Sequence, residues 1–334
     1  MKKIEITSAL LFLISTAVNA GTATVGTDII YGVKSTGGST QDWGTIDPTT
    51  GIFTSIKQIS PTSLGWPLGD IGSQPDPING YVYTRQTNAD LGTNDTLAIK
   101  KSDGTTKWLG VDGSVVGYDT KNNRLILRKN VGGGNNLISY DILTETTSTL
   151  LADFANGQNS WQAGGIGGID SFGRTAFQLN SSNKLYKVNL DTGAETIITL
   201  ASNVVTISWD SKQQKLYGIY NDGSGMRIAG INTSTGALTN ISGINSINGI
   251  GNYVQMIAPN DQRYYVQENG SVIRVISLED GSSLGTFTAP LRLMPVGAVV
   301  MGADNTTKET VTFDINDPDS TIVKKGTNEV TYTG

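Results

Sequence analysis

The sequence predicts an all-β fold of the β-propeller type, and its composition and one repeated hairpin carry that prediction. The 334 residues include 41 glycines, and 16% are charged while 37% are hydrophobic. Many turn formers and few charges are typical of an all-β protein. Residues 185–200, LYKVNLDTGAETIITL, read as an apolar run, an Asp-Thr-Gly turn and a second apolar run, which predicts a β-hairpin. A degraded copy of this hairpin returns along most of the chain.

The turn of this hairpin recurs every 42 to 53 residues. The positions that correspond to Gly193 are Gly51, Gly104, Thr146, Gly236 and Gly281. A period in the forties built from short strands is typical of a propeller blade, which is a sheet of four antiparallel strands. A single blade cannot bury both of its faces, so the repeats are expected to stack around a common centre.

Apolar and β-branched residues at near-alternate positions place the strands within each repeat. The expected strands are 29–34, 42–46 and 53–59 in the first blade; one from 68, then 81–85, 96–100 and 106–111 in the second; 115–118, 124–128, 137–142 and 148–154 in the third; 166–170, 174–179, 185–190 and 195–200 in the fourth; 204–210, 215–220, 227–231 and 237–241 in the fifth; and 253–258, 263–267, 272–278 and 283–288 in the sixth.

The corners between the first and second strands contain Asp or Asn. Examples begin at Asp119, Asp170 and Asp210, and a further corner reads Pro259-Asn260-Asp261. Asp and Asn side chains accept hydrogen bonds from the backbone of their own turn. These residues are therefore interpreted as turn formers rather than catalytic acids.

The first blade lacks an innermost strand of its own. The apolar run 294–301, MPVGAVVM, is expected to return to it and close the ring, which removes exposed sheet edges. This predicts six blades within a propeller of residues 21–301, followed by a C-terminal β tail at 302–334. The alternative has seven blades, the last built from 296–333, with 22–25 as the inner strand of the first blade.

Residues 1–20 are expected to be a signal peptide. Lys2 and Lys3 precede an apolar stretch at 9–18, and Val18-Asn19-Ala20 has the small-x-small form of a cleavage site. No later run has about 18 apolar residues, so no membrane span is expected. The chain has no cysteine, which excludes disulfides and a lipid-modified cysteine anchor. We therefore expect an exported bacterial protein of the periplasm or cell exterior.

Three segments, LYKVNLDTGAETIITL, KLYGIYNDGSGMRIAGINTSTGALTNI and RLILRKNVGGGNNLISYDILTETTSTLL, resemble the repeats of secreted bacterial propellers with xLYxxNxxTGxxxxI units. The resemblance covers about residues 29–300. It implies the propeller fold and says little about activity, because propellers serve hydrolases, lyases, lectins and scaffolds alike.

The absence of histidine and cysteine excludes Ser-His-Asp and Cys-His catalysis and histidine-based metal sites. The net charge of −5 and the lack of basic runs argue against nucleic acid as a partner. No catalytic residue and no cofactor are assigned. Asp314, Asn316, Asp317 and Asp319 could hold calcium, but the EF-hand pattern is not met, so the question of a metal stays open.

Three tryptophans are expected to gather on one face of the propeller. Trp66 and Trp161 lie in loops from an outer strand to the next inner strand, and Trp43 lies at the end of a loop between second and third strands. Exposed aromatic side chains suit recognition of a sugar or a protein. The leading hypothesis is thus a non-catalytic module that binds a protein or glycan through Trp43, Trp66 and Trp161.

Two further functions are compatible with the sequence. One is that of a carboxylate-dependent glycoside hydrolase or lyase that uses acids near the ring centre, such as Asp70, Asp119, Asp170 or Asp210. The second is that of an extracellular assembly subunit in which residues 302–334 lend a strand to a neighbour. The chain would then be a monomer or an assembly through this tail.

Overall fold

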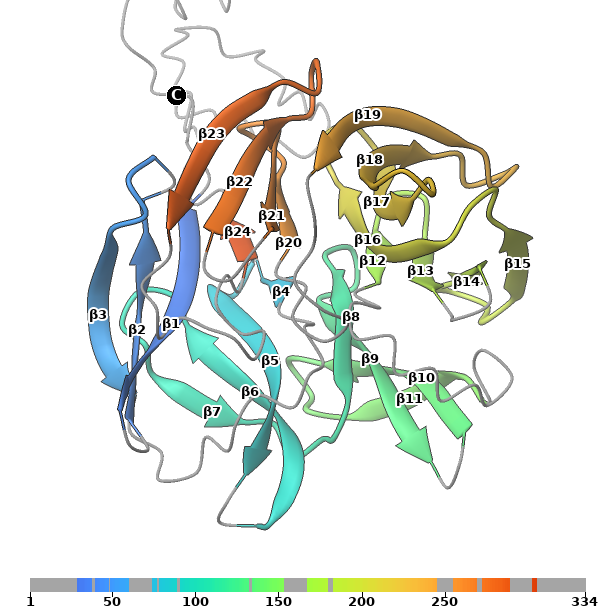
Figure 1. Ribbon diagram of the computed structural model, residues 1–334. Coiled ribbons are helices and arrows are strands. Elements are labelled where there is room, and N and C mark those ends of the chain that lie inside the picture. The colour runs from blue at the N-terminus through green and yellow to red at the C-terminus, as the bar shows by residue number, and fades with distance from the viewer. Residues whose placement is uncertain are drawn as a thin grey trace, which may run out of the picture. The chain divides into compact units, whose positions relative to one another are not determined.

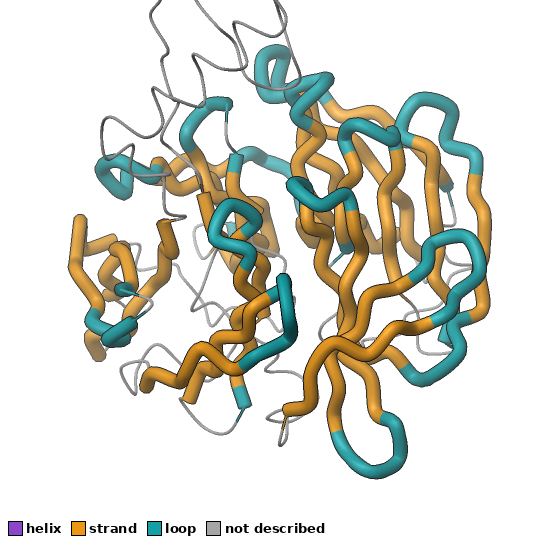
Figure 2. Tube along the Cα trace, turned by 90° about the horizontal axis from the view of Figure 1, so that it is seen from above, coloured by secondary structure: helices purple, strands orange, loops and turns teal. Residues whose placement is uncertain are grey.

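The computed structural model contains six four-stranded antiparallel sheets arranged around a centre, which confirms the predicted six-bladed propeller (Figure 1). It describes residues 29–37, 40–47, 49–59, 74–76, 78–88, 91–131, 134–152, 167–179, 183–244, 255–268, 272–288 and 302–304. Across these ranges the regular structure is entirely β, and no helix long and apolar enough to cross a membrane occurs in them. Figure 2 shows the strands running between loops at both of their ends.

Blades 1 to 3 follow the repeats read from the sequence. Blade 1 contains β24 (Gly302–Asp304), β1 (Ile29–Gly37), β2 (Thr40–Ile46) and β3 (Phe53–Ile59). Blade 2 contains β4 (Gln74–Pro75), β5 (Tyr81–Asn88), β6 (Thr93–Lys100) and β7 (Thr106–Trp108). Blade 3 contains β8 (Ser114–Asp119), β9 (Arg124–Val131), β10 (Gly134–Asp141) and β11 (Thr147–Leu151).

Blades 4 to 6 have the same strand order. Blade 4 contains β12 (Gly168–Asp170), β13 (Thr175–Leu179), β14 (Lys184–Asn189) and β15 (Glu195–Thr199). Blade 5 contains β16 (Val204–Asp210), β17 (Lys215–Asn221), β18 (Met226–Ile231) and β19 (Leu238–Ile244). Blade 6 contains β20 (Gln255–Ala258), β21 (Arg263–Gln267), β22 (Val272–Ser277) and β23 (Ser283–Thr288).

Blade 1 is completed by a strand from the far end of the chain, as expected, but by a different segment. β24 pairs with β1 through Ile29↔Asp304, Ile30↔Ala303 and Tyr31↔Gly302. The closing strand therefore lies just beyond the predicted boundary at residue 301. The predicted segment 294–301 and the tail after 304 lie outside the described residues, as do the expected signal peptide at 1–20 and residues 22–25.

The core consists of hydrophobic clusters between neighbouring blades. Trp43 and Leu97 belong to the cluster between blades 1 and 2, and Val116 and Val188 to that between blades 3 and 4. Ile30 of blade 1 packs in a cluster with Phe287 of blade 6, so the ring is closed by side-chain packing as well as by β24. Each blade thus buries its faces only against its neighbours, as the repeat predicts.

The repeated turn has a local cause. In the fourth blade, Asn189 Oδ1 accepts hydrogen bonds from the backbone N–H groups of Asp191 and Thr192, both at 2.9 Å, and Gly193 N–H donates to Asn189 O at 2.8 Å. Gly193 has φ of 71°, a conformation that glycine adopts without strain. The corresponding residue of blade 3 is Glu145, with φ of 56°, so the predicted equivalence of Thr146 is wrong by one residue.

The same turn glycine also holds the blades together. A Cβ atom on Gly193 would lie 2.1 Å from the carbonyl oxygen of Leu150, which belongs to the outer strand of the preceding blade. A Cβ on Gly236 would lie equally close to Thr199 O of blade 4. The turn therefore sits directly against the neighbouring backbone, and glycine is required for this approach as well as for φ.

Candidate functional site

Strands alternate in direction, so the corners between first and second strands lie at the same end of the blades as the turns between third and fourth strands. This end is called the turn face here. Its corners nearest the centre are 76–80, 119–123, 170–174, 210–214 and 258–262 in blades 2 to 6. The fifth residue of each corner has positive φ: Gly80, Asn123, Arg174, Gln214 and Gln262.

Aspartate begins four of these corners, and three of them cap their own turn. Asp76 Oδ1 accepts from Ile78 N–H at 2.7 Å, and Asp170 Oδ1 accepts from Gly173 N–H at 2.7 Å. Asp210 Oδ1 accepts from the N–H groups of Lys212 and Gln213 at 2.8 and 3.1 Å. The interpretation of Asp170 and Asp210 as turn formers is confirmed.

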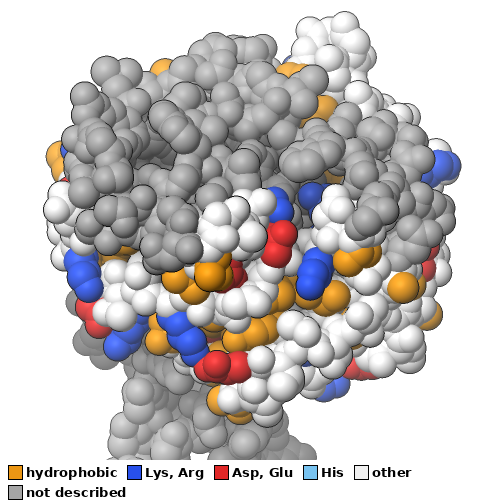
Figure 3. Space-filling model, turned by 90° about the horizontal axis from the view of Figure 1, so that it is seen from below, with side chains coloured by type: hydrophobic (Ala, Val, Ile, Leu, Met, Phe, Trp, Pro, Cys, Tyr) orange, Lys and Arg blue, Asp and Glu red, His pale blue; other side chains and the backbone are white. Residues whose placement is uncertain are grey.

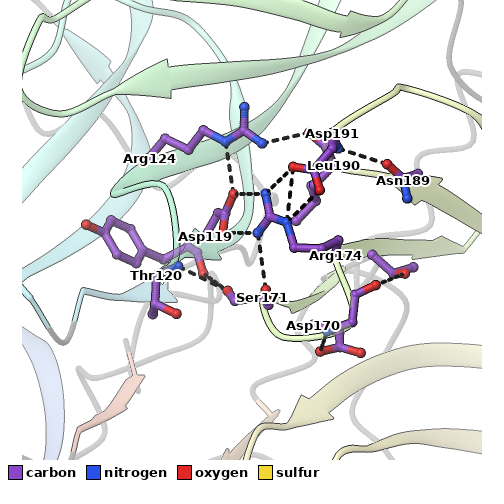
Figure 4. A network of polar contacts seen from close by, with 12 residues as sticks. Asp119, Thr120, Arg124, Asp170, Ser171, Arg174, Asn189, Leu190 and Asp191 are labelled. Carbon is purple, nitrogen blue, oxygen red and sulfur yellow. Dashed lines mark hydrogen bonds and ion pairs between the residues drawn. The ribbon is translucent and has the colours of Figure 1, made fainter. Parts of the chain in front are cut away.

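Asp119 has a different role, because its carboxylate joins two blades (Figure 4). Arg174 of blade 4 donates to it from Nη1 at 2.6 Å and from Nη2 at 2.9 Å, and Arg124 Nε donates at 2.9 Å. Arg174 also bonds Asp191 at 2.8 Å and its own turn at Ser171 O. Asp119 has no exposed surface, whereas Asp191 is exposed, so this network is a clamp between blades 3 and 4 that is built on a buried carboxylate.

The electrostatics of the clamp follow from these contacts. Burial acts to raise the pKa of Asp119, but the hydrogen bonds and charges of Arg174 and Arg124 outweigh it and hold the pKa below its ordinary value. Hydrogen bonds to Asp119 and Asp191 raise the pKa of Arg174. Asp119 is thus ionised at neutral pH and is the partner of two guanidinium groups.

The equivalent aspartates Asp76 and Asp210 are also buried and also connected to the next blade. Asn79 Nδ2 donates to Asp76 Oδ2 at 2.7 Å and to Asn123 Oδ1 of blade 3 at 2.8 Å. Gln262 Nε2 of blade 6 donates to Asp210 Oδ2 at 3.2 Å. Here burial dominates and raises the pKa of Asp210, since its partner across the interface carries no charge.

The turn face also presents exposed apolar side chains. The corners are numbered by their blade, from the second corner (76–80) to the sixth (258–262). Phe172 in the fourth corner is 88% exposed, which is the largest value among the hydrophobic residues in the described ranges. Ile78 occupies the same position of the second corner and is 53% exposed. Leu143 and Ile52, in turns between third and fourth strands, are 78% and 62% exposed. An apolar residue inside an otherwise polar turn could have indicated these positions from the sequence, but none of them was among the predicted site residues.

The structure tests one of the three tryptophans that were predicted to form a binding surface. Trp43 has no exposed surface: it lies within β2, pairs with Val33 across the ladder and stacks on Tyr31 at 5.3 Å between ring centres. Its assignment to a binding surface is wrong, because β2 begins at Thr40 and carries the indole into the interface with blade 2. Trp66 and Trp161 lie outside the described residues and stay predictions.

The remaining predicted chemistry concerns acids and metals. Asp119 and Asp210 are bound into blade interfaces, whereas Asp70 and the acidic segment 314–319 lie outside the described residues. Where the structure does describe the chain, it contains no group of three or more acidic side chains suited to a metal ion. Each of the four aspartates that begin a corner accepts hydrogen bonds within its turn or from a neighbouring blade. Asp170 is the most accessible of the four.

Elsewhere the described surface is mixed. Figure 3 shows a side of the molecule on which hydrophobic side chains reach the surface between Lys or Arg and Asp or Glu side chains. Isolated apolar residues on outer strands, such as Ile197 at 44% exposed, are usual on folded proteins and indicate no ligand. The turn face differs because its exposed apolar residues occupy the tips of turns.

No family model matches the chain, and no curated protein matches it in sequence. Solved structures do match. A chain from a crystal structure of a nidogen/laminin complex aligns with a TM-score of 0.56 at 11% identity, over 84% of this chain and 98% of that chain. TolB from Acinetobacter baumannii gives 0.54 at 14% identity, over 83% and 70%. A putative TolB from Agrobacterium tumefaciens gives 0.52 at 10% identity, over 78% and 90%. At these identities the likeness concerns the fold, and the chain is a six-bladed β-propeller protein.

Proposed function

We propose that this chain is an exported, non-catalytic binding module that recognises a protein partner through its turn face. The observation that carries the proposal is the exposure of Phe172, together with Ile78, Leu143 and Ile52, at the tips of turns on one face. Large apolar side chains held on rigid turns are costly to leave in water, and aromatic side chains of this kind supply much of the energy of protein interfaces.

The fold supports this proposal in two ways. The corners that carry these side chains are anchored by hydrogen bonds to their own turn or to a neighbouring blade, so the exposed side chains are positioned before a partner arrives. Preorganisation of this kind lowers the entropy cost of binding. One of the structures that share the fold is, by its description, a complex of nidogen with laminin, which supports protein recognition by a propeller.

One part of the proposal and its competing alternatives come from the sequence. Export to the periplasm or cell exterior follows from the signal-peptide pattern of residues 1–20. Recognition of a glycan through Trp66 and Trp161 is the competing binding mode, and it would use the opposite face. Polysaccharide cleavage by a carboxylate pair and assembly through the C-terminal tail are the competing functions that do not depend on either binding face.

The test is a selection of displayed random peptides on the immobilised full chain, run beside a glycan array and a polysaccharide digestion. Phe172→Ser removes the main apolar contact, and Ile197→Ser is a matched control on an outer strand of the same blade. We expect selected peptides to bind Phe172→Ser at least about tenfold more weakly, as for an interface hot spot, and to bind Ile197→Ser like the unchanged chain.

Three different outcomes would overturn the proposal. In the first, peptides or glycans bind Phe172→Ser as they bind the unchanged chain but do not bind a Trp66→Ala/Trp161→Ala double variant. Recognition would then use Trp66 and Trp161 and not the turn face. Turnover of a polysaccharide would make the chain an enzyme. A change of oligomeric state on removal of residues 305–334, without peptide or glycan binding, would favour the assembly role.

A further inference from the structure

The fourth corner of the turn face breaks a pattern that three of the corners follow. Asp76, Asp119 and Asp210 are each fully buried, and each is bonded directly or through Asn79 to the following blade. Asp170 is partly exposed. Within the described residues its carboxylate accepts one hydrogen bond, from Gly173 N–H of its own turn.

The reason for this exception lies in the next blade. Arg174 and Gln262, at the fifth corner position, reach back to the aspartate of the preceding blade. Gln214 is the residue that would reach Asp170 by the same geometry, but its Nε2 donates instead to Ser211 O within its own corner. Figure 4 shows the Asp170 carboxylate apart from the cluster of Asp119, Arg174 and Asp191. One carboxylate of the series is thus left open toward solvent.

The aromatic ring of Phe172 shares this corner with Asp170. The same position carries Ile78, Lys121, Lys212 and Asn260 in the remaining corners, so an aromatic side chain beside an available carboxylate occurs at the fourth corner alone among these five. The corner is held in place by Thr120 N–H, which donates to Ser171 Oγ at 3.0 Å, and by Ser171 Oγ, which donates to Tyr118 O at 3.3 Å.

We propose that Asp170 and Phe172 together bind an arginine side chain of the protein partner. This inference rests on the proposed function and names the chemistry of its partner. The carboxylate of Asp170 can accept charge-assisted hydrogen bonds from a guanidinium group, and the planar guanidinium can stack on the ring of Phe172. A lysine ammonium would pair with the carboxylate but has no planar surface for the ring.

Three cations of the described corners, Arg174, Lys121 and Lys212, have interactions with groups other than the Asp170 carboxylate. Arg174 is bound to Asp119 and Asp191 on the far side of the turn. Lys121 of the third corner interacts electrostatically with Asp191, and Lys212 Nζ of the fifth corner donates to Asn260 O at 3.0 Å, toward blade 6. The charge that Asp170 presents is therefore matched best by a cation brought by the partner.

The test uses defined peptide arrays of the form XXXRXXX, XXXKXXX, XXXAXXX and XXXEXXX, in which X is randomised, probed with the folded full chain. We expect the arginine array to bind most strongly, and Asp170→Asn to reduce its signal about tenfold, to the level of the alanine array. Glu279→Gln is the matched control, because it removes one exposed negative charge from a turn on the same face. It should leave the arginine preference unchanged.

The outcomes separate the two proposals. If peptides bind in a way that Phe172→Ser abolishes but show no preference for arginine, the arginine site is refuted while the binding face stands. If Glu279→Gln reduces the arginine signal as much as Asp170→Asn does, the preference reflects net charge and the site is again refuted. If no array binds and Phe172→Ser changes nothing, both proposals fail.

Discussion

Replacing Gly193 by alanine tests the role of the repeated turn in holding neighbouring blades together. The substitution meets two obstacles in the structure: φ of 71°, and a Cβ position 2.1 Å from Leu150 O of the preceding blade. The left-handed conformation costs an alanine about 1–2 kcal/mol. The contact forces the two backbones apart by about 1 Å, and such overpacking costs about 1–3 kcal/mol more. The free energy of unfolding should fall by about 2–5 kcal/mol.

Gly80 provides a matched control for the conformational part. It has φ of 77°, but no atom lies within 4 Å of the position of its Cβ. Gly80→Ala should therefore cost only the conformational part, about 1–2 kcal/mol. Urea unfolding followed by tryptophan fluorescence measures both variants. Equal losses of stability in Gly193→Ala and Gly80→Ala would refute the claim that the turn glycine is required by the contact between blades.

Three further predictions concern contacts between neighbouring blades. Glu145→Gly should leave the urea midpoint unchanged or raise it slightly. The substitution removes the cost of a left-handed backbone conformation at a non-glycine residue, about 1 kcal/mol, and loses an exposed ion pair with Lys107 that stabilises by less. A clear fall of the midpoint would contradict this expectation. Trp43→Ala should cost about 3–5 kcal/mol in the same assay, whereas an exposed Trp43 would cost almost nothing. Asp119→Asn should cost about 3–5 kcal/mol at pH 7. The pKa of Asp119 is lower in the folded than in the unfolded chain, so its stabilisation is complete above pH of about 4 and is lost as the pH falls below that value. The unfolding midpoint of the variant should therefore fall less steeply than that of the unchanged chain as the pH is lowered below about 4, and parallel curves would contradict the clamp.

The blade repeat could be predicted from the sequence because the turn that defines it is formed by residues that are close together in the chain. Asn189 and Gly193 lie four residues apart, and the backbone hydrogen bond from Gly193 N–H to Asn189 O joins residues of the same turn. The closing strand was harder to locate. β24 has three residues that include a glycine, and it carries less apolar pattern than the segment 294–301 that precedes it.

The exposure of side chains at the candidate site was predicted less well because exposure is a property of the assembled blades. Trp43 was placed at the end of a loop, on an exposed face, but the ladder of β1 and β2 extends past it and its side chain lies in the interface with blade 2. The clamp between Asp119 and Arg174 joins residues 55 positions apart, so only an alignment of one corner with the next could have suggested it. Such an alignment would also have shown Phe172 as the aromatic exception among the corners.

Hydrogen–deuterium exchange of the full chain with and without a selected peptide tests the central claim most directly. We expect the peptide to slow exchange in the corners 119–123 and 170–174 and to leave the hairpins around Leu91 and Val131, at the opposite end of the blades, unchanged. Slower exchange confined to that opposite end would contradict recognition through the turn face.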